Sequence, residues 1–75
     1  MRRLGYFLHI TPSGRLIVKL NSPKPPRLGS KVLNSRGDVI GILIDVIGPV
    51  RSPYGVVKPS LPELSLSKYE ELFTR

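Results

Sequence analysis

The sequence predicts an all-β fold, a small antiparallel barrel that is closed or nearly closed. Five or six short apolar stretches are separated by turn residues, and the 75-residue chain holds eight prolines and seven glycines. Little of the chain has helical periodicity. Closure is favoured because it removes the unpaired sheet edges that so small a domain has few other means to cover.

The first half of the chain predicts a hairpin. Residues 4–10 and 15–20 alternate as strands do, and the residues between them have the composition of a turn. Alternation places these apolar side chains on one face of each strand: Leu4, Tyr6, Leu8 and Ile10 in the first, and Leu16, Val18 and Leu20 in the second. Residues 21–27 follow, with three prolines in four positions, and predict a stiff connector. A polyproline ligand for an aromatic groove is the alternative.

The second half predicts three further strands, over residues 31–34, 39–47 and 56–59. Arg36-Gly37-Asp38 lies between the first two and has the composition of a hairpin turn. The same tripeptide resembles a cell-adhesion ligand, but a chain without cysteine or an expected secretion signal favours the turn.

The strand at residues 39–47 is apolar on both faces. One face carries Ile40, Ile42, Ile44 and Val46, and the other carries Val39, Gly41, Leu43, Asp45 and Ile47. A strand of this kind is covered by its own fold on one side, and we expect another molecule to cover the other.

The tail is expected to differ from the barrel. We assign residues 1–60 to the barrel domain and residues 61–75 to a tail or short helix. Ser67 precedes Glu70 by three residues, as in a capping box, and Tyr69, Leu72 and Phe73 would share one side of such a helix.

Composition limits the function classes. The chain has a formal net charge of +7 and no cysteine, so disulfides and cysteine-ligated metals are excluded. A cysteine-free domain without an expected signal peptide or membrane span fits a cytoplasmic setting. The basic charge suggests proximity to RNA or DNA, or alternatively a solubilising coat.

The residues do not indicate an enzyme, a metal site or a cofactor. His9 is the single histidine, and Asp45 has no nucleophile or metal-ligand partner at a recognisable spacing. The glycines are scattered at turns and form no phosphate-binding loop. Five aromatic residues are few for a base-stacking platform. Protein binding remains, because Gly48-Pro49-Val50 and Pro53-Tyr54 form a rigid apolar ridge with tyrosine as a frequent interface anchor.

At this ridge the sequence resembles the small Gar subunit of archaeal H/ACA ribonucleoproteins. The resemblance covers most of residues 4–59 and rests on one signature, Gly41-x-x-x-Asp45-Val46-x-Gly48-Pro49-Val50-x-x-Pro53-Tyr54-x-x-Val57-Lys58. It continues upstream through Leu28-Gly29-Ser30-Lys31-Val32 and Gly37-Asp38-Val39-Ile40-Gly41. The chain departs from the pattern at Ile47, where an aromatic residue is common, and at Gly55, where a bulkier one is common.

The resemblance implies a six-stranded barrel of the type found in translation elongation factors. It also implies a non-catalytic subunit that binds the pseudouridine synthase and makes little direct RNA contact. Such a subunit helps substrate RNA load and leave during rRNA pseudouridylation, by engaging a mobile loop of the synthase. The implied partner-binding residues lie along the signature: Asp45, Ile47, Gly48, Pro49, Val50, Pro53, Tyr54, Val56, Val57 and Lys58.

Two other functions stay open. A small RNA-binding barrel associated with the ribosome or translation would bind RNA through cations and lose affinity steeply with salt. The cations concerned are Arg2, Arg3, Arg15, Lys19 and Lys24. A barrel that dimerises through exposed edges is the third, and sedimentation over a concentration series would detect it.

Overall fold

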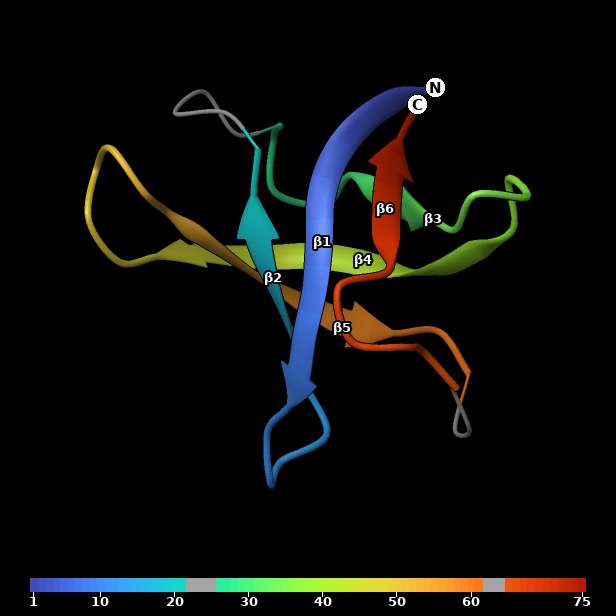
Figure 1. Ribbon diagram of the computed structural model, residues 1–75, viewed down its shortest axis with the longest axis horizontal. Coiled ribbons are helices and arrows are strands. Elements are labelled where there is room, and N and C mark those ends of the chain that lie inside the picture. Colours follow the sequence, from blue (N-terminus) through green and yellow to red (C-terminus); the bar gives the residue numbers. More distant parts are fainter. Residues whose placement is uncertain (22–25, 62–64) are drawn as a thin grey trace.

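The computed structural model describes residues 1–21, 26–61 and 65–75, and it is a closed six-stranded antiparallel barrel (Figure 1). The strands are β1 (Arg2–Ile10), β2 (Leu16–Leu20), β3 (Lys31–Leu33), β4 (Val39–Ile47), β5 (Tyr54–Pro59) and β6 (Glu71–Thr74). Their order around the barrel is β1-β2-β5-β4-β3-β6. The all-β barrel prediction is confirmed, and the described part of the chain contains no helix long and apolar enough to cross a membrane. The expected proline-rich connector lies largely outside the described residues.

The tail forms a strand, so the expected helix is wrong. Residues 71–74 of β6 pair with β1 on one side and β3 on the other, through Arg2↔Thr74 and Leu33↔Phe73 among others. Leu72 is fully buried while Glu71 is exposed, which is the alternation of a strand. Pairing with two strands satisfies more backbone groups than a short edge helix could, because both β1 and β3 would otherwise carry an open edge.

Ser67 and Glu70 form the hydrogen bond that a capping box predicts, but they form it in a turn rather than at the start of a helix. The Ser67 N–H donates to Glu70 Oε1 at 3.2 Å, and the Glu70 N–H donates to the Ser67 carbonyl at 3.0 Å. Tyr69, at the third position of this turn, has a φ of 69°, the only positive value at a described residue other than glycine. A positive φ at the third position is typical of a type II turn, which ends the loop and aims the chain into β6.

The core fills the barrel with aliphatic side chains and one phenylalanine. The buried hydrophobic residues are Leu4, Phe7, Leu16, Val18, Leu20, Val32, Leu33, Ile40, Leu43, Val57 and Leu72. The predicted inward face of β2 is confirmed. The predicted face of β1 is wrong, since Phe7 is buried and Ile10 is 49% exposed.

Bulges interrupt the alternation of β1. The register shifts between Arg3 and Gly5 against β6, and between Phe7 and His9 against β2. The first bulge adds one residue, so the inward side chains Leu4 and Phe7 are three positions apart rather than two. Ile10 pairs with the buried Leu16 but lies at the exposed end of the strand. A glycine is required at position 5, because a Cβ there would lie 1.8 Å from the Lys19 carbonyl oxygen.

Bulges also divide the apolar side chains of β4. The register shifts against β3 beside Ile40 and against β5 beside Ile44, so Ile40, Gly41 and Leu43 are all buried. Ile42, Ile44 and Ile47 are left on the outside, each about 40% exposed. The expected second apolar face therefore exists, although simple alternation assigned its members incorrectly.

Barrel closure by β6 should dominate stability. We expect Leu72→Ala to lower the free energy of unfolding by about 2–5 kcal/mol, since it opens a cavity at a fully buried position. Arg75→Ala, at an exposed position after β6, should change it by less than about 0.5 kcal/mol. Urea denaturation followed by circular dichroism measures both. Equal, small effects would mean that residues 71–74 are not part of the cooperative barrel.

Candidate protein-docking surface

The loop between β4 and β5 projects the apolar ridge into solvent. The Ser52 N–H donates to the Pro49 carbonyl at 3.1 Å, so Val50 and Arg51 occupy the two central positions of a β-turn. Val50 is 86% exposed, the highest value among the exposed large hydrophobic residues. Gly48 begins the loop with a φ of 91°, a conformation that a residue with a Cβ adopts only with strain.

Tyr54 is held between the backbone of Gly48 and the side chain of Lys19. A Cβ at position 48 would lie 3.0 Å from Cδ2 of the Tyr54 ring, so the ring packs where glycine leaves room. On the other side, Lys19 Nζ lies 4.8 Å from the ring centroid and donates to Ser52 Oγ. The lysine therefore joins the ring to the loop, and the tyrosine is fixed in orientation before any partner arrives.

Asp45 supports the same hairpin from β4. Its side chain is exposed, and Oδ1 accepts the Val46 N–H at 2.8 Å, immediately after the bulge at Ile44. Neither of the ion pairs formed among the described residues involves this carboxylate. The Asp45 carboxylate therefore bonds a backbone amide at this bend.

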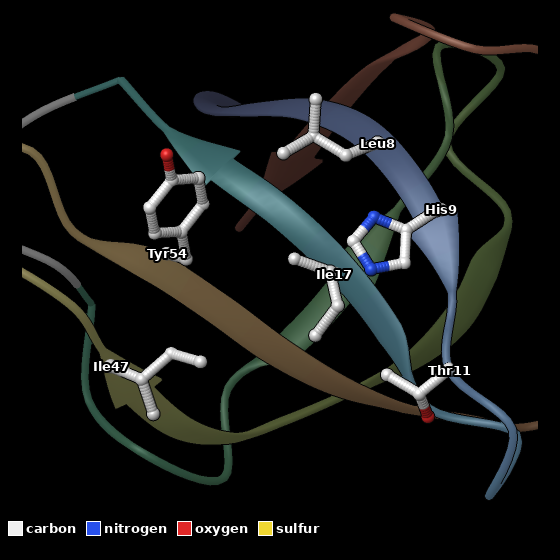
Figure 2. A pocket seen from close by; sticks show the side chains of 6 residues that line it. All are labelled: Leu8, His9, Thr11, Ile17, Ile47 and Tyr54. Atoms are coloured by element: carbon white, nitrogen blue, oxygen red, sulfur yellow. The ribbon is translucent and has the colours of Figure 1, made fainter.

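An open depression of about 410 Å³ lies beside the ridge on the outside of the barrel (Figure 2). Its wall comes from β1, β2, β4 and β5 and is lined by Leu8, His9, Thr11, Ile17, Ile47 and Tyr54. Cross-strand pairing brings them together, with His9 opposite Ile17 and Ile47 opposite Tyr54. Most of the lining is apolar, so the depression is suited to an aliphatic or aromatic side chain.

The structure places eight of the ten implied partner-binding residues at least partly on the surface. Six of these are exposed, namely Asp45, Ile47, Gly48, Pro49, Val50 and Lys58, and two are half-buried, namely Tyr54 and Val56. Val57 is fully buried in the core and Pro53 is buried, so these two side chains support the surface from beneath. Gly55 also faces inward, because a Cβ there would lie about 3 Å from Leu43 and Leu20.

Four residues of the depression were missed by sequence reasoning: Leu8, His9, Thr11 and Ile17. Ile17 carried a signal, since it is an apolar residue on the outward face of a strand. The residues that lie next to Ile17 on the barrel surface are set by the strand order β1-β2-β5-β4, in which strands distant in sequence lie side by side. This order cannot be read from the alternation within a single strand.

The described residues provide neither a metal site nor an unsatisfied buried polar side chain. Among residues 1–21, 26–61 and 65–75, no three His, Cys, Asp or Glu side chains gather where they would hold a metal ion. Every buried side-chain nitrogen or oxygen of the described residues has a hydrogen-bond partner. What the arrangement offers a ligand is a fixed ring, exposed aliphatic groups and flanking cations.

Comparison with known proteins gives one informative relative. No family model matches the chain. Over 60 residues the chain is 40% identical to an uncharacterized protein of the archaeon Methanothermobacter thermautotrophicus. The matched region is 80% of this chain and 63% of the relative, so the chain spans less than two thirds of the relative's length. The sequence therefore has an archaeal homologue over most of its length.

The effect of the Gly48–Tyr54 contact on stability can be measured by comparing alanine substitutions at two glycines. Gly14 and Gly48 both have a positive φ, of 86° and 91°, but a Cβ at Gly14 would meet nothing within 4 Å. Gly14→Ala should therefore cost only the backbone strain, about 1–2 kcal/mol, whereas Gly48→Ala should cost measurably more. Urea denaturation measures the two costs, and adding Tyr54→Ala should abolish the excess. Equal costs for both alanines would contradict the packing of Tyr54 on Gly48.

Proposed function

We propose that this chain is a Gar-type subunit of an H/ACA ribonucleoprotein, a non-catalytic protein that docks on the pseudouridine synthase. The observation that carries the proposal is the gathering of Ile47, Val50 and Tyr54 on one outer side of a closed barrel. Val50 and Tyr54 are signature positions, and all three residues keep apolar surface open to solvent, with Ile47 and Tyr54 lining the apolar depression. A monomer gains nothing by leaving such a patch in water, whereas a docking subunit needs it.

The surface has the physical properties of a tight interface. The turn at residues 49–52 and the clamped ring of Tyr54 are ordered in the free barrel, so little conformational entropy is lost on association. Binding energy in such interfaces concentrates in a few central anchors, among which tyrosine is enriched. The depression would receive an apolar side chain of the synthase, and the exposed isoleucines would exclude water around it.

In mechanism, the subunit would act on the synthase through a mobile loop. A binding partner shifts a loop between closed and open states only by binding those states with different affinities. A rigid ridge is suited to this role, because its shape fits one loop conformation better than the other. The consequence would be faster loading and release of substrate RNA with no catalytic group supplied by this chain.

Direct RNA binding by exposed cations is the second candidate, and the charge of +7 favours it. Two of the cations expected to carry it are already engaged within the chain. Arg3 pairs with Glu71 at 3.2 Å, and Lys19 bonds Ser52 and covers Tyr54. Arg2 and Arg15 remain as candidates for phosphate contact, and Lys24 lies outside the described residues. This pattern supports protein docking as the main function.

Titration calorimetry of this chain with the pseudouridine synthase subunit of the same organism tests the proposal. We expect tight binding that changes little between two salt concentrations, because apolar contact dominates. Tyr54→Ala should weaken binding by about 30-fold, as expected of a central anchor worth about 2 kcal/mol. Val50→Asp should weaken it comparably by placing a charge in the interface.

Leu28→Ala is the matched control, since Leu28 is 59% exposed and lies outside the signature ridge. It should leave the dissociation constant within about twofold, and thermal melts should show all three variants folded. Guide RNA is titrated in parallel. Strong, salt-dependent binding to RNA with none to the synthase would overturn the proposal and leave the RNA-binding candidate.

A further inference from the structure

A row of tyrosines and lysines runs from Tyr54 of the ridge across β2 and β1 to the loop before β6. Pairing of β1 with β2 sets Tyr6 opposite Lys19, and pairing of β2 with β5 sets Lys19 opposite Tyr54. From the loop before β6, Tyr69 meets Tyr6 edge to face with ring centroids 5.6 Å apart. Lys68 Nζ lies 5.2 Å from the Tyr69 ring centroid. All three tyrosines of the chain thus lie in one row, in the order Lys68, Tyr69, Tyr6, Lys19 and Tyr54.

The position of Tyr69 is costly for a tyrosine. Its φ of 69° lies in the left-handed region, where glycine or asparagine is usual in a turn of this kind. The turn is over-determined by its neighbours: the Tyr69 N–H donates to the Phe7 carbonyl at 2.7 Å, and the Phe7 N–H donates to the Glu70 carbonyl at 2.9 Å. An exposed aromatic side chain kept in a strained conformation suggests that its ring has a use outside the fold.

Charge identifies the kind of ligand. Two acids of the described residues lie near the row, and both are occupied: Glu71 pairs with Arg3 at 3.2 Å, and Glu70 accepts the Ser67 N–H. Within the described part of the chain, neither Lys68 nor Lys19 pairs with a carboxylate: Lys68 covers the Tyr69 ring, and Lys19 covers the Tyr54 ring and donates to Ser52 Oγ. The whole chain has a net charge of +7. Rings interleaved with ammonium groups match an unpaired nucleotide, whose base stacks on an aromatic surface while its phosphate meets a cation.

We infer that Tyr6, Tyr69 and Lys68 form a small binding site for single-stranded RNA, in which a base stacks on the 58%-exposed Tyr69 and the adjoining phosphate binds Lys68. The site spans one or two nucleotides, so its affinity is modest and confined to this edge of the barrel. It is independent of the docking proposal, because the three residues lie on β1 and the loop before β6 rather than on the β4–β5 ridge.

Fluorescence anisotropy with a short labelled oligouridylate, at two salt concentrations, tests the site in the isolated chain. Tyr69→Gly removes the ring and relieves the positive φ, so the barrel should keep its melting temperature while RNA affinity falls about fivefold or more. Tyr6→Ala should also weaken binding. Lys68→Ala should weaken it more than Lys31→Ala, which removes the same charge from an exposed position on β3.

Three results would overturn the inference. Unchanged affinity in a folded Tyr69→Gly variant would remove the stacking role. Equal losses for Lys68→Ala and Lys31→Ala, without any effect of the tyrosine changes, would reduce binding to non-specific charge attraction. Salt-insensitive binding of a polyproline peptide with no RNA binding would assign the tyrosines to peptide recognition instead.

Discussion

Pairing of β6 with both β1 and β3 is the constraint on which the rest of this structure depends. A sheet of five short strands would leave two open edges and a core exposed at one side. Four residues close it, and Leu72 fills the remaining space from the inside. Closure also joins the two ends of the sheet β1-β2-β5-β4-β3, whose strands β1, β2, β5 and β4 form the wall of the docking surface. The protein-docking surface and the RNA site therefore both depend on β6, although β6 contributes no residue to either.

Much of the fold could be predicted from the sequence, because turns and alternation are local. The strand at residues 39–47 matches β4 at both ends, and the inward face of β2 was predicted correctly. The errors arise where a local pattern competes with a distant partner. Bulges in β1 and β4 change which side chains face inward, and they exist to accommodate neighbouring strands rather than to satisfy the sequence around them. The tail was predicted incorrectly for the same reason, because it forms a strand only by pairing with β1 and β3, which are distant in sequence.

The candidate site could be predicted in part for a related reason. Gly48 and Pro49 mark a sharp turn by their chemistry, so the ridge was visible in the sequence. The depression beside it was not, because Leu8 and Ile17 reach Ile47 only around the barrel. Val57 was assigned to the surface by its position in the signature, whereas the structure uses it in the core. A signature mixes residues that contact a partner with residues that hold those residues in place.

The register Arg2↔Thr74 has a consequence for how the chain is made. The first strand of the barrel pairs with the sixth, and both ends of the described chain lie side by side (Figure 1). Non-local pairing of this kind is slow to form, because the loop that it closes contains nearly the whole domain. Until Thr74 has left the ribosome, β1 has an unpaired edge and the core is open. The barrel therefore cannot close before β6 has been synthesised, and the unpaired strands are open to aggregation until then.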